Sequence, residues 1–265
     1  MSFEEQDLTN ALLDNRSPLV QRFSRLHQLN DNEINALNKM HEQTTVLDAN
    51  EIILHEGDYH KNCMVIVSGW AYRFSRLLDG DRQVINYYLP GDIISPFALV
   101  QPKTDYSIAS LTKIDVCVFK PDFLLQMFSE EPRLGLIYGQ MLGREDALSA
   151  EQIVRLGVRS AYERTAHLLL EFFHRLKLVG LTDAETTYSF PLTQELLADT
   201  LGMSFVHMNR TLRKLRDNNL IYIDSNQMTL LNVDELITIA EYKPYYPQIG
   251  LNTDINKIIK STDFH

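Results

Sequence analysis

Cysteine is scarce in this chain, and its scarcity limits the metal chemistry that the chain can support. The 265 residues contain only two cysteines, Cys63 and Cys117. Two thiols are too few for an iron–sulfur cluster held by four cysteines of one chain, and their spacing does not suit a zinc site. Both lie in apolar, strand-like runs, so we expect buried thiols rather than a disulfide.

Long apolar runs are also missing. No stretch of about 18 apolar residues occurs, so no membrane-spanning helix and no membrane partner are expected. The first ten residues, MSFEEQDLTN, are acidic and lack the apolar core of a secretory signal. Together with 45% hydrophobic and 23% charged residues, these features predict a globular protein of the cytoplasm with one large or two ordinary domains.

Motifs of the common enzyme classes are absent as well. The sequence has no nucleophile elbow, phosphate-binding loop, zinc-protease helix or dinucleotide fingerprint, and we therefore do not expect an enzyme. His55, Asp58 and His60 lie around one turn, but their spacing is not that of HExxH. A polar surface turn explains them, and no metal site is expected.

Positive charge is in short supply overall but concentrated in one place. The chain has 25 basic and 35 acidic residues, a net charge of −10, and the first 60 residues are its most acidic part. By contrast, the segment from Ser204 to Arg216 carries four basic residues and no acidic one. A cationic segment in an acidic protein indicates a phosphate-bearing partner. The alternative is an ordinary helix whose basic face is simply solvated.

The pattern around this basic segment predicts two helices joined by a tight turn. The first runs from Thr193, a suitable N-cap, to Thr200. Gly202 supplies the backbone freedom that the turn needs, and Ser204 can cap a second helix that extends to Asn218. At about 100° per residue, three apolar residues of this second helix face the core, and three others point the opposite way. The core-facing residues are Met208, Leu212 and Leu215, and the outward-facing residues are Val206, Arg210 and Arg213.

The residues on either side of this unit complete a compact domain. Apolar runs at 220–223 and 228–231 predict a β-hairpin, the wing of a winged helix. A strongly amphipathic helix from Arg159 to Leu178 provides a core face for the two helices. A last helix should end at Tyr242, and we have no structural expectation for the polar residues that follow the Lys243 to Pro247 break.

The N-terminal half has a different periodicity. Helical patterns cover Pro18 to Leu29 and then continue from Asp31, a suitable N-cap, through Met40. From Thr44 to Phe119 the apolar period is two, with turns about every ten residues, which predicts a barrel or double-sheet roll. The predicted strands are 52–54, 64–67, 70–77, 84–89, 107–111 and 116–119.

A long helical pattern links the two halves. From Phe123 to Arg155 the chain is helical again, and Pro132 can start a long helix. Leu134, Met141 and Leu148 recur every seven residues with Ile137 and Tyr138 between them, which suits either a dimer seam or core within one chain. Gly157 is the expected hinge.

At the level of motifs, TQELLADTLGMS and NRTLRKLRDNNLI resemble the helix-turn-helix of the CRP/FNR family of bacterial transcription regulators. The turns EGD at 56–58, Ser68-Gly69 and PGD at 90–92 are similar to landmarks of the cyclic-nucleotide-binding β-roll. The resemblance implies an α+β fold with a jelly-roll-like sensor domain, a long dimerisation helix and a C-terminal winged helix-turn-helix. The implied segments are 1–128 for the sensor with its helices, 129–157 for the dimerisation helix, 158–235 for the DNA-binding domain and 236–265 for an extension.

This resemblance implies a homodimeric regulator that binds a palindromic double-stranded operator and acts on RNA polymerase. The alternative is a β-roll sensor that works through a protein partner and whose helix-turn-helix does not bind DNA. Cationic Arg210, Arg213 and Lys214 favour the first hypothesis, whereas apolar Phe205 and Val206 favour the second.

The resemblance also implies which residues contact DNA. Arg210 matches the family's base-reading arginine, and Ser204, Thr193 and Gln194 should contact phosphate. Many relatives carry a cytosine-reading Glu where this chain has Val206, so the operator should differ from the usual one. The residues expected to contact DNA are Thr193, Gln194, Ser204, Phe205, Val206, His207, Asn209, Arg210, Arg213 and Lys214.

The sensor domain departs from the nucleotide-binding members of the family. Pro96 stands about where those members have a ribose-binding Glu, and residues 104–110 include Asp105 but no phosphate-binding Arg. We therefore predict that neither cyclic AMP nor cyclic GMP binds. Haem, which a His or Cys of the roll holds in some relatives, stays an open alternative. The residues of a candidate effector pocket are Gly91, Asp92, Phe97, Tyr106 and Ser107.

Overall fold

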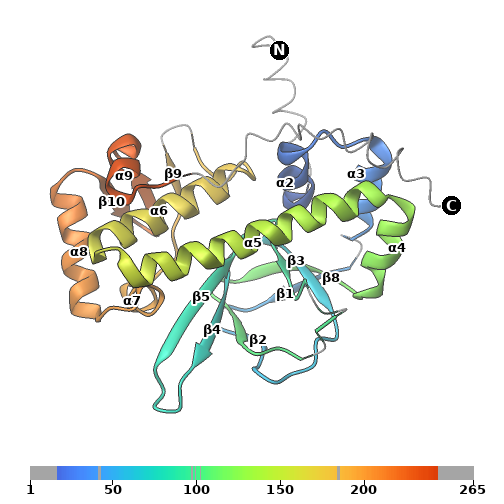
Figure 1. The fold of residues 1–265 in the computed structure, drawn as a ribbon, viewed down its shortest axis with the longest axis horizontal. Helices are drawn as coiled ribbons and strands as arrows, with labels where there is room; N and C mark the ends of the chain where they lie inside the picture. Colours follow the sequence, from blue (N-terminus) through green and yellow to red (C-terminus); the bar gives the residue numbers. More distant parts are fainter. Residues whose placement is uncertain are drawn as a thin grey trace, which may run out of the picture.

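The computed structural model describes residues 17–40, 43–96, 98, 100–101, 103–183 and 186–243. They form an N-terminal β-roll with short helices and a C-terminal winged helix-turn-helix domain (Figure 1). The long helix α5 runs along both parts and connects them (Figure 1). The predicted α+β fold is confirmed.

The β-roll consists of two four-stranded antiparallel sheets, with strand orders β1-β8-β3-β6 and β2-β7-β4-β5. Each predicted strand is present within two residues of its expected bounds, but β1 and β6 were not predicted. No residue of β1 is fully buried, and β6 is only two residues long, so neither strand shows an alternation of apolar and polar residues in the sequence. The strands are β1 Thr44–Leu47, β2 Ile52–Leu54, β3 Cys63–Ser68, β4 Ala71–Arg76, β5 Arg82–Tyr88, β6 Ile93–Ile94, β7 Ser107–Ser110 and β8 Ile114–Phe119.

Two short helices precede the roll. α2 (Pro18–Leu26) and α3 (Asp31–Lys39) lie where helical periodicity was predicted. The predicted cap of α3 was wrong by one residue. Asn30, not Asp31, is the N-cap, because its side chain accepts the Glu33 amide while Glu33 accepts the Asn30 amide, which together form a capping box.

After the roll, α4 (Asp122–Glu130) leads into α5 (Pro132–Val158), which begins at the predicted proline. The helix does not end at Gly157, where the hinge was predicted, because α5 continues through Gly157 to Val158. The direction of the chain changes one residue later, where Arg159 is extended and Ser160 caps the next helix. A glycine can stay helical when the residues around it do so, and here the cap of the following helix sets the break.

The heptad stripe of α5 faces inward. All five of its apolar residues are at most 9% exposed within a single chain. Of the two alternatives left open for this stripe, core within one chain is therefore correct, and a dimer seam along the same residues is not. The residues concerned are Leu134, Ile137, Tyr138, Met141 and Leu148.

The C-terminal domain contains the predicted helix-turn-helix and wing. Its wing hairpin turns at Ser225 and Asn226, whose φ angles of 49° and 60° suit a two-residue turn. A third strand, β9, pairs with β11 and was not predicted. The elements are α6 Ala161–Lys177, β9 Thr187–Ser189, α7 Gln194–Leu201, α8 Phe205–Asp217, β10 Ile221–Asp224, β11 Gln227–Leu230 and α9 Val233–Ala240. The predicted C-terminal extension begins inside α9, because residues 236–240 belong to that helix, and its residues 244–265 lie outside the described residues.

The roll and the C-terminal domain share one hydrophobic core. Trp70 of the turn before β4 and Tyr87 of β5 each place their ring 5.1 Å from the ring of Phe172 on α6. Such aromatic pairs contribute about 0.5–1.5 kcal/mol each beyond the area they bury. The C-terminal domain is therefore packed against the β-roll of its own chain.

Both cysteines are buried thiols within the roll, as expected. Burial raises the pKa of Cys63 to about 12 and that of Cys117 to about 11, so neither is ionised at neutral pH. In the part of the chain that the structure describes, no helix combines the length and apolarity that crossing a membrane requires.

Candidate DNA-binding surface, ion-pair network and cavity

The helix-turn-helix is built by three local features of the sequence. Thr193 caps α7 by accepting the Leu196 amide at 3.1 Å. Gly202 takes the left-handed conformation (φ 57°, ψ 48°) that ends α7, and Ser204 caps α8 by accepting the His207 amide. These features confirm the predicted helix, turn and helix.

Helix α8 presents a cationic and partly apolar face to solvent. Met208, Leu212 and Leu215 are buried, as the periodicity predicted. Phe205 and Val206 are 53% and 61% exposed, and the basic residues of the helix point outward with them. These exposed basic residues are Arg210, Arg213, Lys214 and Arg216. Figure 1 shows α8 at the outer end of the molecule, away from the roll.

The other residues predicted to contact DNA lie on or beside this surface, but some of them already contact other side chains of the same chain. Asn209 donates from Nδ2 to Oε1 of Gln194 at 2.9 Å, so these two residues hold α8 against α7. His207 is exposed. Lys214 places Nζ 4.6 Å from the centre of the Tyr162 ring. The residues predicted to contact DNA therefore lie on one surface. Asn209 and Gln194 also hold α8 against α7, a role that the sequence did not reveal.

The N-terminus of α6 is a part of this surface that the residue prediction missed. A groove of about 620 Å³ between α6 and α8 is lined by Ser160, Tyr162, Ser204, Arg210 and other residues. The capping box of α6, in which Ser160 accepts the Glu163 amide, marks this helix start and could have revealed it. The surface thus combines helix N-termini, whose amides attract phosphate, with arginines that can bind guanine or phosphate.

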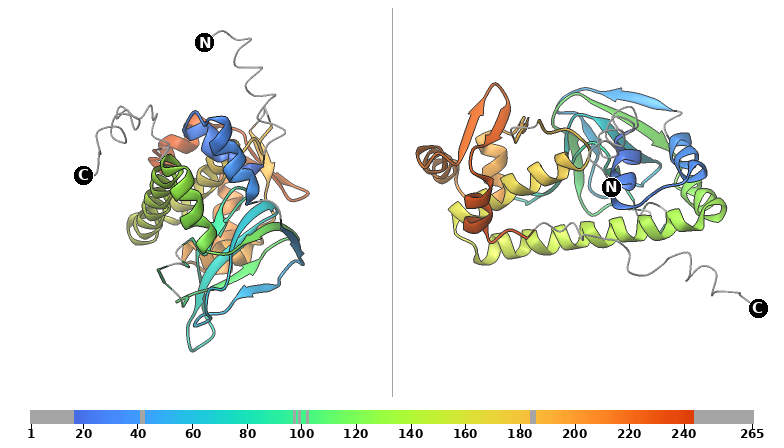
Figure 2. Two further views of the ribbon diagram at one scale, coloured as in Figure 1. Left: turned by 90° about the vertical axis from the view of Figure 1, so that its right-hand side faces the viewer. Right: turned by 90° about the horizontal axis from the view of Figure 1, so that it is seen from above.

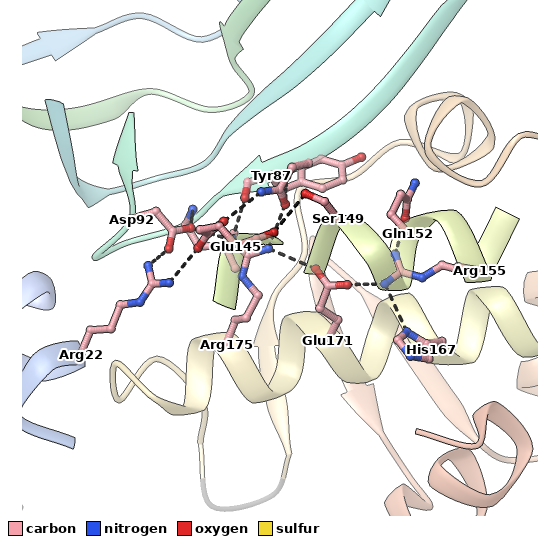
Figure 3. Close-up of polar contacts among 12 residues, drawn as sticks. Arg22, Tyr87, Asp92, Glu145, Ser149, Gln152, Arg155, His167, Glu171 and Arg175 are labelled. Atoms are coloured by element: carbon pink, nitrogen blue, oxygen red, sulfur yellow. Dashed lines mark hydrogen bonds and ion pairs between the residues drawn. The ribbon is translucent and has the colours of Figure 1, made fainter. Parts of the chain in front are cut away.

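Away from this surface, near the C-terminal end of α6, Asp92 joins α2, the roll and the C-terminal domain (Figure 3). One of its oxygens binds Arg22 of α2, and the other accepts from Arg175 of α6 at 2.6 Å. The same oxygen accepts the Leu89 amide at 2.7 Å. Arg175 also donates to the Tyr87 carbonyl at 2.7 Å. Asp92 is thus an anchor between domains.

The network continues along α6 toward the end of α5. Glu171 accepts from Arg175 at 3.1 Å and also binds Arg155 of α5. Arg155 lies 3.2 Å from Nδ1 of His167, whose Nε2 lies 3.1 Å from Glu151 (Figure 3 labels Arg155, His167 and Glu171). Buried ion pairs of this kind fix a geometry strongly, because losing one partner leaves the other charge buried.

The ionisation of the network favours its folded form. Burial alone would raise the pKa of Glu171, but Arg155 and Arg175 outweigh it, so this pKa lies below its usual value. Burial likewise opposes ionisation of Glu145, yet its attraction to Arg22 and Arg175 lowers its pKa. Burial lowers the pKa of Arg22 to about 10, which still leaves it charged at neutral pH.

His167 is the neutral member of this network. Burial first, and then the charges of Arg155 and Arg159, lower its pKa to about 3. A neutral ring that accepts from Arg155 at Nδ1 and donates from Nε2 to Glu151 fits the observed contacts.

A second contact holds α7 against strand β5. Arg82 donates from Nε to Asp199 at 2.8 Å, and the Tyr87 hydroxyl lies 2.6 Å from Oγ1 of Thr200. The Thr200 carbonyl also accepts from Gln152 of α5 at 2.9 Å. The first helix of the helix-turn-helix is thereby bonded to both the roll and α5.

A cavity of about 180 Å³ lies between the roll, α2 and α5. Of the predicted effector residues, Asp92 and Tyr106 line it. Gly91 does not; it has φ 87°, and a Cβ there would be 2.9 Å from the Pro18 carbonyl, so α2 packs on it. Ser107 instead accepts the Glu56 amide at 3.0 Å, and Phe97 lies outside the described residues.

Other lining residues come from distant elements and were not predicted. Arg73 comes from β4, Tyr88 from β5, and Tyr138 and Glu145 from α5. In the sequence they read as strand and helix residues, and no local motif marks them. Only the pairing of β4 with β5 and β7, together with the packing of α5, brings them to one cavity.

Two domain profiles match the chain over its two halves. Residues 44–131 match the cyclic nucleotide-binding domain, and residues 163–239 match the Crp-like helix-turn-helix domain.

Several characterised regulators are similar over most of their length. The transcriptional activatory protein AadR of Rhodopseudomonas palustris is 30% identical over 185 residues, which cover 69% of this chain and 74% of that protein. The nitrogen fixation regulation protein FixK of Bradyrhizobium diazoefficiens is 28% identical over 182 residues, covering 69% and 75%.

Solved structures agree on the fold. The structure of FixK2 from Bradyrhizobium japonicum superposes with a TM-score of 0.67 at 22% identity and covers 76% of this chain and 98% of that chain. A CRP/FNR family regulator from Thermus thermophilus, TTHA1359, gives 0.59 at 19% identity, with coverage of 76% and 99%.

Proposed function

This chain belongs to the CRP/FNR family of transcription regulators, and from that premise we propose that it reads a palindromic operator as a homodimer. It is a DNA-binding regulator of the CRP/FNR type, and its relatives are transcription regulators, not enzymes. What remains to be argued is how two copies pair, how they read DNA and what the sensor domain binds.

We propose that the homodimer forms through the face of α5 that the rest of the chain leaves exposed. Figure 2 (right) shows α5 along the outer edge of the molecule, with the other described elements on one side of it. Its exposed residues alternate at spacings of three and four, the repeat of a coiled-coil seam. This repeat, which we call the outer stripe, comprises Leu136, Gly139, Gly143, Asp146, Ala150, Ile153 and Gly157.

The glycines of the outer stripe support a close helix pair. A Cβ added to Gly139, Gly143 or Gly157 would meet no atom within 4 Å, so no contact with the described residues requires glycine there. Each glycine destabilises a helix by about 0.5–1 kcal/mol relative to alanine. A second α5 approaching closely along the stripe would give them a function. Ile153, 73% exposed, would be buried by the same contact.

A two-fold pair of chains presents two α8 helices to DNA. We propose that Arg210 reads a guanine in each half-site, while Ser204, Thr193 and the neighbouring basic residues contact phosphates. Phe205 and Val206 would pack against thymine methyl groups, which gives an operator unlike that of relatives with a cytosine-reading Glu. The exposure of Arg210 and the cationic face around it support this model over a helix-turn-helix that binds no DNA.

The sensor domain, in this proposal, does not respond to a cyclic nucleotide. Residues 104–110 hold no arginine, and the cavity of about 180 Å³ is smaller than the roughly 300–1,000 Å³ typical of ligand pockets. We place the regulator in the cytoplasm, where it would act on RNA polymerase at the promoter.

Two matched substitutions test the homodimer. Ile153→Glu puts a charge on the outer stripe, whereas Leu125→Glu makes the same kind of change at a residue of α4 that is 60% exposed. Light scattering should give about twice the 30.6 kDa chain mass for the wild type and Leu125→Glu, and one chain mass for Ile153→Glu.

Gel-shift assays complete the test. Ile153→Glu should lose operator binding, because one half-site alone binds weakly, while Leu125→Glu should retain it. A monomeric wild type that still binds a palindromic operator would contradict the proposal, as would a dimer that Ile153→Glu leaves intact.

A further inference from the structure

Arg73 is a cation inside the β-roll without an acidic partner. Its guanidinium stacks over the Tyr106 ring at 4.7 Å from the ring centre. Its Nε is buried and has no hydrogen-bond partner, and no carboxylate of the described residues lies within ion-pair distance of it. The side chain as a whole is half-buried, and a buried donor without a partner is costly, so Arg73 is equipped to bind an anion.

The other charges deep in the cavity are already neutralised. Arg22 is held by Asp92 and Glu145, and Arg175 binds the second oxygen of Asp92. Asp146 lines the cavity from an exposed position on α5. Its negative charge at the rim disfavours a ligand with more than one negative charge. The wall therefore suits a monoanion.

The remaining wall is aromatic and apolar. Tyr88, Tyr106 and Tyr138 face the cavity together with Met141 and Leu142. The Tyr138 hydroxyl donates to the Pro96 carbonyl at 2.9 Å. Burial raises the pKa of Tyr88 further above its usual value, so it adds no negative charge next to an anion. A flat aromatic body would stack well on such side chains.

The size of the cavity restricts that body to about one ring. An apolar protein cavity of about 150 Å³ holds benzene, and this cavity measures about 180 Å³. We propose that it binds a small aromatic monocarboxylate, with the carboxylate on Arg73 and the ring among the tyrosines. This inference rests on the proposed function, because it names the ligand class of the regulator's sensor domain.

Such a ligand would lie next to the interdomain network. Arg22 and Glu145 line the cavity, and Arg22 shares Asp92 with Arg175 of α6. Occupation of the cavity is therefore placed to alter how the DNA-binding domain is held.

Calorimetric titration of the full-length protein with benzoate or phenylacetate tests the ligand class. At neutral pH we expect saturable binding of one carboxylate molecule per chain. The neutral analogue benzamide should bind at least about tenfold more weakly, because it lacks the charge-assisted hydrogen bond to Arg73. Cyclic AMP should not bind. Equal affinity for benzoate and benzamide, or binding of neither carboxylate, would overturn the inference.

Two variants of strand β4 test the residue. Arg73→Gln should weaken carboxylate binding about tenfold or more. Arg76→Gln, the same change at an exposed position on the same strand, should leave it within twofold. Unchanged affinity in Arg73→Gln would overturn the assignment of Arg73, and a thermal midpoint close to that of the wild type verifies its fold.

Gel shifts with the wild type separate a failure of the proposed ligand class from a failure of the proposed DNA binding. If the protein binds its operator but no carboxylate, the ligand class is wrong and the regulator proposal stands. If it binds a carboxylate through Arg73 but no operator, the proposed mode of DNA reading fails instead.

Discussion

Arginine has two opposite roles in this protein, one on the exposed face of α8 and one in the buried network between the domains. Arg210 and Arg213 are exposed and surrounded by further cations, so they are available for a partner. Arg155 and Arg175 are at most 6% exposed and are held by acidic residues of their own chain. The same side chain is thus free to bind a partner in one region and is held between the domains in the other, and burial decides between these two states. Substitutions should therefore separate the two regions cleanly.

The largest effect is expected from Arg175→Ala. It would leave Asp92 and Glu171 without one of their cations and the Tyr87 carbonyl without its donor. Breaking a buried pair in this way costs about 3–5 kcal/mol of unfolding free energy, which urea denaturation measures. Arg76→Ala, at an exposed position, is the control. A loss below about 1 kcal/mol would show that the network does not hold the domains together.

Arg210→Ala should affect binding and not stability. Its removal should cost about 1–3 kcal/mol of base discrimination at each half-site, enough to abolish specific operator binding in gel shifts. The thermal midpoint should stay within a degree or two, because the side chain is exposed. Unchanged operator affinity would refute the docking of α8 in the major groove.

The network also predicts a pH dependence. Because the pKa of His167 is lowered to about 3 from an ordinary 6.5, the unfolded chain binds one more proton below pH 6.5, and stability falls as the pH drops from 6.5 toward 3. Glu145 and Glu171 have lowered pKa values, so their stabilising effect is present above their ordinary pKa of 4.5 and is lost below it.

The pKa values of His27, His60 and His174 are also lowered by burial, so the contribution of His167 is the difference between His167→Gln and the wild type between pH 5 and 6.5. His167→Gln should flatten the stability profile there by up to about 1.4 kcal/mol per pH unit, the effect of one proton. His55→Gln, at an exposed turn, should keep the wild-type slope. An unchanged slope in His167→Gln would mean that the ring is not held neutral.

The smallest effect concerns Lys214. Because we propose that Lys214 contacts a phosphate, Lys214→Ala should weaken binding to all DNA sequences by the same factor. The slope of log affinity against log salt should fall by about one unit per chain. Loss of affinity for the operator alone, with the slope unchanged, would instead identify Lys214 as a base-reading residue.

The two regions also differ in how far the sequence reveals them. Thr193, Gly202 and Ser204 act within a few residues of their own position, so the caps, the turn and the outward face of α8 could all be predicted. The network and the cavity could not, because Arg22, Asp92 and Arg175 meet only after the domains pack. Arg73 reads as an ordinary strand residue until β4 lies between β5 and β7.

Helix α5 shows a subtler limit. Its apolar repeat at Leu134, Met141 and Leu148 was correctly recognised, but periodicity does not say which partner a stripe faces. The roll and the N-terminal helices cover Leu134 and Met141 within one chain, and Leu148 is buried as well. The outer stripe, rich in glycine, carries little hydrophobic signal and so was passed over.

Selection of bound sequences from a random pool of duplex DNA, at physiological salt and with the purified full-length protein, tests the central claim most directly. The account predicts enrichment of a palindrome with half-sites about one helical turn apart, a guanine in each half-site, and loss of that enrichment in Arg210→Ala. Enrichment of no sequence, or of a single half-site without two-fold symmetry, would contradict it.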